Sequence, residues 1–372
     1  MKAEPNAAVL DDPGRIARQD PSGMFSLLAR WPQQWQEAAE RAKDARLPEE
    51  SQARGSGTGG FRHVVVSGMG GSAIGGDLLR SYLGDSLSVP LVVNRSYACP
   101  AFVGPDTLFV AVSYSGNTEE TLSSLAEALR RGAEVAGGAG GGRLQEECQR
   151  AGKVVFPVPG GLPPRQALGY LLLPVLGLLE SLGLAADQSS AIEETGEVLA
   201  ELVDAYGPDV PAAENPAKDL AISLHGKVPV IYGVEGRTDA VAVRWRGQIH
   251  ENSKNWATSN VLPELDHNEV TGWRSLSAVT REAVWLIFLE DVEDGERMAR
   301  RRELTRGLIS PFVSGAVTVQ SRGRGRLARL LSLVLLGDFV SCYLAVLNRV
   351  DPFPVPLIED LKKALAGQSP PE

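Results

Sequence analysis

Short apolar runs rich in β-branched residues alternate along the chain with longer segments whose apolar positions recur about once per helical turn. The runs fall at residues 64–67, 90–93, 108–112, 154–157, 228–232, 283–289 and 316–320. Strands that alternate with helices in this way predict α/β architecture with doubly wound, mostly parallel sheets flanked by helices. Because the alternation stops after the fourth run and then restarts, the pattern predicts two α/β subdomains.

The segments outside this alternation are predicted to be helical links and ends. We expect an N-terminal helical extension at residues 1–50, a first subdomain at 51–185, a helical connector at 186–216, a second subdomain at 217–350 and a C-terminal helix at 351–372. In the extension, Pro32 interrupts an amphipathic run and predicts a kink or the start of a second helix. The glycine-rich stretch 132–142 is expected to be a flexible turn.

The most apolar stretch, residues 330–347, is long enough to suggest a membrane span. It contains Asp338, however, and a charge at bilayer depth is costly. We therefore expect a buried helix and no association with a membrane. The polar N-terminus also lacks the apolar core of a signal sequence.

Composition narrows the class of protein further. The 372 residues carry a formal net charge of −9, which argues against a general nucleic-acid binder because such proteins present a basic face. Three cysteines without CxxC spacing and four histidines without an HExxH motif indicate neither a disulfide framework nor a zinc site. We expect a cytoplasmic protein that needs no metal.

Glycines and hydroxyl side chains follow two of the predicted strands. The sequence SGMGGSAIGGD at 67–77 ends the first strand and opens a helix, so Gly70, Gly71 and Ser72 would let a ligand approach the backbone. Free N–H groups at the start of that helix would favour an anion. The loop is also compatible with a dinucleotide-binding turn, or with a tight strand-to-helix turn that binds nothing.

The second such segment is SYSGNTEET at 113–121, which follows the strand at 108–112. The hydroxyls of Ser113, Ser115 and Thr118 beside a glycine and a helix start predict a phosphate site that uses no lysine. Asn117 and Glu120 also fit a helix N-cap and capping box. Capping accounts for these two residues but not for the two serines before them.

These motifs occur in order with several others: LPPRQALGY at 162–170, ENSK at 251–254, LPELDHNE at 262–269, DP at 351–352 and LK at 361–362. Together they resemble the bifunctional phosphoglucose/phosphomannose isomerase family of sugar-isomerase (SIS) proteins, from about residue 60 to 365. The resemblance implies two SIS subdomains and a homodimer with shared active sites. It also implies a cofactor-free interconversion of fructose 6-phosphate with glucose 6-phosphate and mannose 6-phosphate, through ring opening and a cis-enediol.

The resemblance implies roles for four charged residues. One carboxylate can move a proton between C1 and C2 of the sugar, and Glu251 stands at the position of the family's base. Arg165 would stabilise the enediolate oxygen. His267 would reach the partner's site and open the sugar ring, since histidine titrates in the right range. Lys362 on the C-terminal helix would assist ring opening.

Neighbouring residues leave alternatives to these assignments. Glu264 and His250 are the nearest rivals of the proposed base and histidine, and Lys363 could replace Lys362. A Lys-Lys pair near a helix C-terminus also interacts favourably with the helix dipole without any function. The resemblance further implies that Thr118 leaves room near C2, so that both epimers are accepted.

Three other functions compete with this interpretation. A non-catalytic SIS protein that senses a sugar phosphate would keep the hydroxyl cradle but would need no base. A nucleotide-dependent oxidoreductase would use the first glycine loop for its cofactor. An isomerase of another sugar phosphate would share the fold and most of the chemistry.

Overall fold

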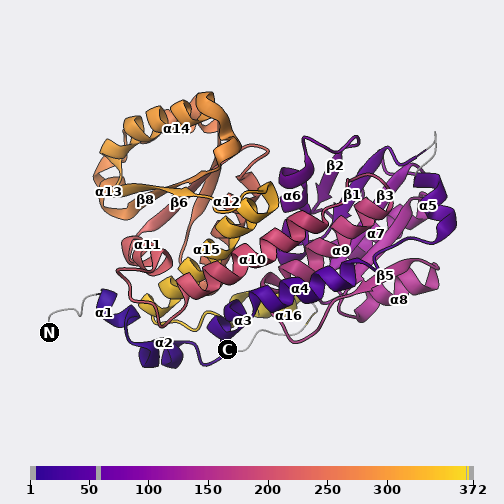
Figure 1. Ribbon diagram of the computed structural model, residues 1–372, viewed down its shortest axis with the longest axis horizontal. Helices are drawn as coiled ribbons and strands as arrows, with labels where there is room; N and C mark the ends of the chain where they lie inside the picture. Colours follow the sequence, from indigo (N-terminus) through magenta and orange to yellow (C-terminus); the bar gives the residue numbers. More distant parts are fainter. Residues whose placement is uncertain (1–5, 56–59, 366, 368–372) are drawn as a thin grey trace.

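The computed structural model describes residues 6–55, 60–365 and 367, so the outer ends of the first and last expected segments lie outside it. It contains two separate sheets in which every neighbouring pair of strands is parallel (Figure 1). The predicted fold class, two parallel-sheet α/β subdomains flanked by helices, is confirmed. The first sheet has the order β2-β1-β3-β4-β5 and consists of β1 His63–Ser67, β2 Leu91–Asn94, β3 Thr107–Ser113, β4 Glu134–Ala139 and β5 Val154–Pro157.

The second sheet is smaller and has the order β7-β6-β8-β9. Its strands are β6 Val228–Val234, β7 Thr258–Leu262, β8 Val284–Glu290 and β9 Gly315–Gln320. The helices around the two sheets are α6 Gly71–Leu83, α7 Glu119–Arg130, α8 Gly142–Arg150, α9 Leu168–Ser181, α11 Pro216–Leu224, α12 Asp239–Ser253, α13 Ser277–Ala283 and α14 Gly295–Ile309. The helix α10 Ser189–Tyr206 runs in front of both subdomains in Figure 1 and packs on α4 and α15.

The apolar helix α15, Arg326–Leu347, lies in the centre of the molecule. Its length and composition would suffice to cross a membrane, but every residue of its most apolar window is buried inside the protein. The helix packs against α10, α11 and α12, so its apolar side chains are covered on all sides. The prediction of a buried helix here is confirmed.

The prediction of a flexible turn at residues 132–142 is wrong, because this stretch contains the fully buried strand β4. A Cβ on Gly137 would lie 2.9 Å from Leu144 Cδ2 and 3.1 Å from Cys148 Sγ. The glycines therefore let α8 pack closely on the sheet. They mark a tight helix–sheet contact and not a loose loop.

Strand β7 was not predicted from the sequence. Its residues TSNVL are mostly half-exposed because β7 is the edge strand of the second sheet. An edge strand with a polar sequence lacks the continuous apolar run that identifies the buried strands.

The N-terminal extension forms α1 Asn6–Leu10, α2 Pro13–Gln19, α3 Met24–Ala29, α4 Trp31–Ala42 and α5 Glu49–Gly55. Pro32 lies at the start of α4, as one of the two predicted outcomes requires. Trp35 Nε1 donates to the Ile192 carbonyl at 2.9 Å, and Trp31 Nε1 donates to Gln166 Oε1 at 3.0 Å. The extension is thus part of the core and reaches the turn that carries Arg165.

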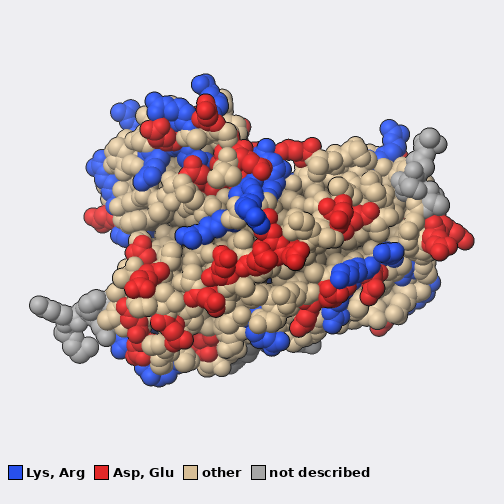
Figure 2. Space-filling view, viewed as in Figure 1, with Lys and Arg blue, Asp and Glu red and all other residues tan. Residues whose placement is uncertain are grey.

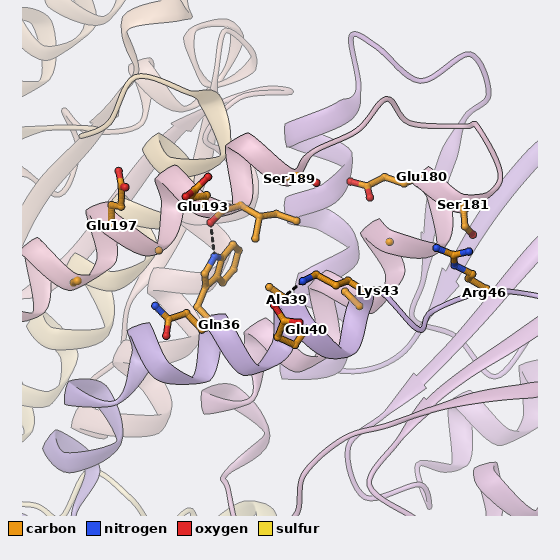
Figure 3. Close-up of a pocket in the computed structure, with 16 residues that line it drawn as sticks. Gln36, Ala39, Glu40, Lys43, Arg46, Glu180, Ser181, Ser189, Glu193 and Glu197 are labelled. Atoms are coloured by element: carbon orange, nitrogen blue, oxygen red, sulfur yellow. Dashed lines mark hydrogen bonds and ion pairs between the residues drawn. The ribbon is translucent and has the colours of Figure 1, made fainter.

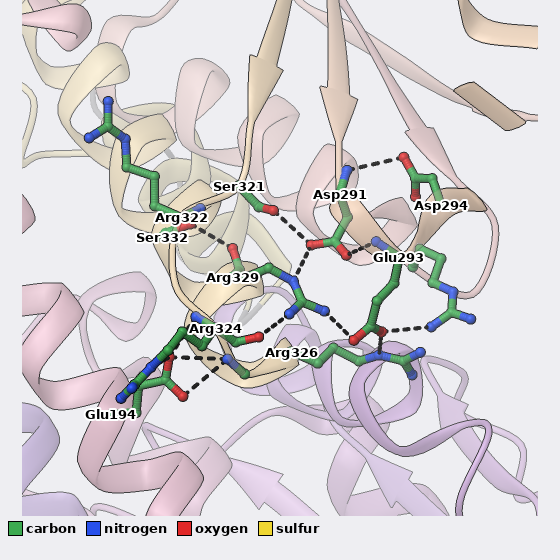
Figure 4. A network of polar contacts seen from close by, with 12 residues as sticks. Glu194, Asp291, Glu293, Asp294, Ser321, Arg322, Arg324, Arg326, Arg329 and Ser332 are labelled. Carbon is green, nitrogen blue, oxygen red and sulfur yellow. Dashed lines mark hydrogen bonds and ion pairs between the residues drawn. The ribbon is translucent and has the colours of Figure 1, made fainter. Parts of the chain in front are cut away.

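Charged side chains join the two subdomains where the second sheet ends, and Figure 4 shows Arg326 and Arg329 among the residues on the side of the second subdomain. Arg326 and Arg237 both pair with Asp85 of the first subdomain, at 2.9 and 3.0 Å. Behind them, the buried Arg329 donates from Nε to Asp291 Oδ2 at 2.8 Å. This network links the start of α15 to the end of β8.

Candidate active site

The two loops predicted to bind phosphate lie side by side at the carboxyl edge of the first sheet. They follow β1 and β3, the adjacent strands at which the strand order reverses. Ligands of doubly wound sheets bind in the crevice at this point. Among the described residues, no side chain caps α7, so its first N–H groups remain open to an anion. At the start of α6, the Ser72 and Ala73 N–H groups already donate to the carbonyls of Met69 and Gly70 at 2.9 and 3.2 Å.

Hydrogen bonds hold the two loops together. Ser72 Oγ accepts from the Tyr114 N–H at 3.1 Å, and the hydroxyls of Ser113 and Thr118 lie 2.8 Å apart. Ser115 is exposed and accepts from the Asn117 N–H at 3.2 Å. The structure therefore brings the predicted hydroxyls to one edge, although Ser113 itself is buried.

The predicted capping box at Asn117 and Glu120 is wrong. Helix α7 begins at Glu119 with Thr118 as its N-cap residue, and Asn117 lies outside it. The Asn117 side chain instead accepts from the Arg143 N–H at 3.2 Å and donates to the Ser115 carbonyl at 3.1 Å. It supports the loop against the start of α8, so it does not cap its own helix.

Arg165 lies in a short 3-10 turn that is pressed against the first glycine loop. A Cβ on Gly71 would lie 2.9 Å from the Pro164 carbonyl carbon and oxygen, so only glycine permits this approach. The Arg165 side chain is 3% exposed. Burial lowers the pKa of its guanidinium, while the charge of Glu251 opposes that shift.

All three nitrogens of the Arg165 guanidinium have partners. Nε donates to Asn252 Oδ1 at 2.7 Å, one terminal nitrogen contacts Glu251 Oε2 at 3.3 Å, and the other donates to the carbonyls of Pro352 and Phe353 at 2.9 and 2.7 Å. These partners come from α12 and from the chain after α15. The planar fork of arginine is thus fixed from several directions.

Glu251 lies near the end of α12 and is about one-third exposed, unlike the buried Arg165 beside it. The predicted base and the predicted oxyanion-stabilising group are therefore in contact, although they lie 86 positions apart in the sequence. The rival Glu264 is exposed and bonds Asn268 at 2.9 Å on a different loop. The other rival, His250, faces the Ala257 backbone at 2.9 Å.

Three residues without a role predicted from the sequence border this contact: Lys254, Asp351 and Asn252. Lys254 adopts a left-handed φ of 53°, uncommon for a residue with a side chain. Its ammonium donates to the carbonyls of Glu251 and Asp351, both at 2.8 Å. Burial lowers the pKa of this ammonium, and the nearby Arg165 lowers it further. The ENSK motif at 251–254 could have indicated the role of Lys254, because it places a cation three residues after the proposed base.

A buried ion pair supports Arg165 from behind. Arg244 donates to Asp338 Oδ2 at 2.7 Å and to the Arg165 carbonyl at 3.0 Å. Gln248 donates to Asp338 Oδ1 at 2.8 Å. Asp338, which interrupted the apolar run in the sequence, is thus a structural anchor for the candidate site.

His267 lies far from Glu251 in the same chain. It follows β7, at the edge of the second sheet where α12 begins, whereas Glu251 lies near the other end of that helix. The thirteen residues from Asp239 to Glu251 rise about 18 Å along the helix. Among the described residues, no hydrogen bond or ion pair joins His267 to Glu251 or Arg165.

The loop that carries His267 is held firmly although the histidine itself is exposed. Asp266 accepts from Arg301 at 2.9 Å and from the Thr305 hydroxyl at 2.7 Å, both on α14. On the other side, Glu269 accepts from Asn260 at 2.6 Å and from the buried Tyr232 hydroxyl. Burial, together with Glu269, raises the pKa of Tyr232. The histidine is thus presented outward on a rigid support.

Lys362 lies on the exposed helix α16, Pro356–Leu365. In the described part of the chain it makes no ion pair with Glu251 or any other carboxylate, whereas Lys363 pairs with Asp360 at 3.8 Å. The structure therefore brings together the two loops, Arg165 and Glu251, but not His267 or Lys362.

A separate hollow of about 980 Å³ lies between α4, α9 and α10 (Figure 3). Its wall carries carboxylates and two cations, and Gly177 and Gly196 let the helices approach one another. Neither Arg165 nor Glu251 lines it. Within the described residues, no three His, Cys, Asp or Glu side chains are grouped so as to hold a metal ion.

Comparisons with known proteins show the family and the fold of this chain. Residues 213–365 match the bacterial phospho-glucose isomerase C-terminal SIS domain. The chain is 44% identical over 343 residues to a bifunctional phosphoglucose/phosphomannose isomerase of Caldicellulosiruptor bescii, covering 92% of this chain and 99% of that one. It is 37% identical to the enzyme of the same name from Aquifex aeolicus, covering 82% and 91%. A hypothetical protein from Thermus thermophilus has a similar fold, with a TM-score of 0.69, 19% identity and coverage of 95% and 96%.

Proposed function

The chain belongs to the bifunctional phosphoglucose/phosphomannose isomerase family, and we propose that the contact between Arg165 and Glu251 is its catalytic centre. The protein is an isomerase that interconverts fructose 6-phosphate with glucose 6-phosphate and mannose 6-phosphate. The observation that carries the proposal is the 3.3 Å approach of Arg165 to Glu251 Oε2, on a turn that is pressed against the glycine loop at Gly71.

The chemistry requires one proton to move between C1 and C2 of the open-chain sugar. Glu251 takes the proton from one carbon and returns it to the other, and its partial exposure lets it reach a substrate. The negative charge that develops on the substrate oxygen is stabilised by Arg165, whose orientation is fixed before substrate binds. The phosphate is held by the hydroxyls of Ser72 and Ser115 and by the N–H groups at the start of α7.

Ring opening needs a further acid or base near the ring oxygen. We assign it to His267 of a second copy in a homodimer, since His267 lies at the far end of α12 from Glu251 in its own chain. The rigid, outward-facing support of His267 favours this arrangement. In this proposal Lys362, on the C-terminal helix α16, assists the opening of the sugar ring.

We also propose a cellular location and domain boundaries for this chain. The three cysteines are all unpaired and buried, which fits the reducing cytoplasm that we propose as its location. The domain boundaries that we propose follow the two sheets, with α10 as the connector between them.

A coupled assay of glucose 6-phosphate formation tests the proposal, with fructose 6-phosphate and separately with mannose 6-phosphate plus an added phosphoglucose isomerase. Both substrates should turn over, and Glu251→Gln should lose at least about 100-fold in kcat for each. The matched control Glu264→Gln, on an exposed loop, should keep full activity. A Glu251→Gln enzyme with normal turnover would exclude Glu251 as the base. A folded wild-type protein that binds both sugar phosphates without turnover would instead be a sensor.

A further inference from the structure

The C-terminal helix α16 presents an apolar face that nothing in its own chain covers. Leu357, Ile358, Leu361 and Leu365 recur at helical spacing and are 83%, 42%, 60% and 68% exposed. None of the ten residues of α16 is buried. A helix this short is marginal in water, and its stability normally comes from packing of its apolar face.

A second unpartnered face lies on α14 of the other subdomain. Leu304 and Leu308, one helical turn apart, are 51% and 64% exposed. Together with Val270 they line a hollow of about 300 Å³, whose other walls are arginine side chains and the loop of His267. Arg297, Arg300 and Arg301 make this face basic, as the blue side chains over α14 in Figure 2 show.

The two faces do not cover each other within one chain, because α14 lies at the upper left of Figure 1 and α16 at its lower middle, with α10 and α15 between them. Helix α16 is instead joined to the part of the proposed active site that holds Arg165, and α14 to the part that holds His267. Helix α16 begins shortly after Phe353, whose carbonyl accepts from Arg165 at 2.7 Å. Helix α14 holds the His267 loop through the bonds from Arg301 and Thr305 to Asp266.

We propose that the apolar face of α16 docks into the hollow on α14 of a second copy of this chain. The inference rests on the shared active site proposed above: bringing His267 of one copy to Arg165 and Glu251 of the other brings these two helices together as well. Asp360 borders the apolar face of α16 on the side away from Lys362, and Arg297 lines the hollow, so an acidic and a basic side chain can meet across the contact. Two-fold symmetry makes the contact twice, once for each active site.

The proposed docking also gives different positions to the neighbouring side chains of Lys362 and Lys363. On a helical projection, Lys362 lies about 40° from Ile358 and therefore at the edge of the docked face. Lys363 lies on the opposite side, where it pairs with Asp360. The structure thus assigns Lys362, and not Lys363, to the side of α16 that faces the partner.

Disulfide trapping tests the contact in the full-length protein, because the three native cysteines are buried. A chain with Leu304→Cys and Leu361→Cys should form a covalent dimer under mild oxidation. A chain with Val292→Cys and Leu361→Cys should not, since Val292 is 78% exposed but lies outside the hollow. Equal cross-linking of the two chains, or none in the first, would overturn the docking.

The variant Leu361→Asp gives a second measurement by light scattering and isomerase assay. We expect a folded chain of monomer mass, 39.7 kDa, that has lost its activity. A Leu361→Asp protein that stays dimeric would refute the docking of α16 alone and leave the isomerase function intact. An active monomer would refute the shared active site itself.

Discussion

Arg244 donates a hydrogen bond to Asp338 at 2.7 Å, and both side chains are almost completely buried. Removing only one partner leaves an unpaired buried charge, so Asp338→Leu should lower the free energy of unfolding by about 3–5 kcal/mol. The double variant Arg244→Met, Asp338→Leu should recover most of that loss, because both charges are gone. Urea unfolding of the wild type, the single variant and the double variant measures these differences.

The same double variant separates stability from function. Arg244 also donates to the Arg165 carbonyl at 3.0 Å, so its loss should loosen this arginine, for which we propose a catalytic role, even in a stable protein. We expect the double variant to unfold like the wild type but to isomerise fructose 6-phosphate more slowly. A double variant that is as unstable as the single one would contradict the ion-pair argument.

Arg165→Lys tests whether the geometry of the guanidinium matters beyond its charge. One ammonium cannot replace a planar fork that bonds Asn252, Glu251 and two carbonyls at once. We expect kcat to fall by about 100-fold or more, with a smaller change in KM, because the lost stabilisation acts on the transition state. The control Arg246→Lys changes an arginine of α12 that donates to the Ser259 hydroxyl at 3.2 Å, away from this contact, and it should have normal kinetics.

Two features of the sequence were sufficient to locate much of this site. The strand-ending loops with Gly70, Gly71 and Ser72, and with Ser113 to Thr118, could be predicted to meet because both follow parallel strands. The family resemblance added Arg165 and Glu251, which the structure places in contact. Their roles as oxyanion-stabilising group and base stay predictions.

Other features could not be predicted from a single sequence. The glycines of β4 suggest a loop until the close approach of Leu144 and Cys148 to Gly137 is known. Asp338 looks like an interruption of an apolar helix, since its partner Arg244 lies 94 residues earlier. The function of Trp31 in supporting Gln166 likewise depends on tertiary packing that leaves no local pattern.

Thr118→Gln tests the basis of dual specificity. Thr118 lies at the start of α7, where its hydroxyl contacts Ser113, and a longer side chain would occupy space beside the substrate. We expect kcat/KM for mannose 6-phosphate to fall by more than that for glucose 6-phosphate, because the two sugars differ at C2. Coupled assays with both substrates measure the ratio, and unchanged rates for both would remove Thr118 from the specificity argument.

Asp291 makes the contact between the end of β8 and α15 sensitive to acid. Burial alone would raise its pKa, but bonds from Arg329, the Glu293 N–H and Ser321 lower it overall from 3.8. The unfolded chain therefore binds the proton more readily, and the stabilisation is complete above the unfolded value and lost as the pH falls through the folded one.

Asp291→Asn should accordingly cost about 2 kcal/mol of unfolding free energy at pH 7, the usual contribution of hydrogen bonds to a charged group. The difference from the wild type should stay constant down to about pH 5 and shrink as the pH falls below 3.8. Denaturant unfolding at a series of pH values measures it, with Glu296→Gln on the exposed first turn of α14 as the control. A cost that persists unchanged in acid would show that the lost stability does not depend on the charge of Asp291.

Mixing two inactive variants tests whether each active site uses both copies of the chain. In a shared site, Glu251→Gln destroys the base of its own site, and His267→Ala removes the histidine from the partner's site. A heterodimer of the two variants then retains one intact site, formed by Glu251 of the second chain and His267 of the first. Random assortment makes half of the dimers mixed, so co-expression should restore about a quarter of wild-type activity. If each chain supplied its own histidine, both sites of every heterodimer would be damaged, and the mixture would be no more active than its parents.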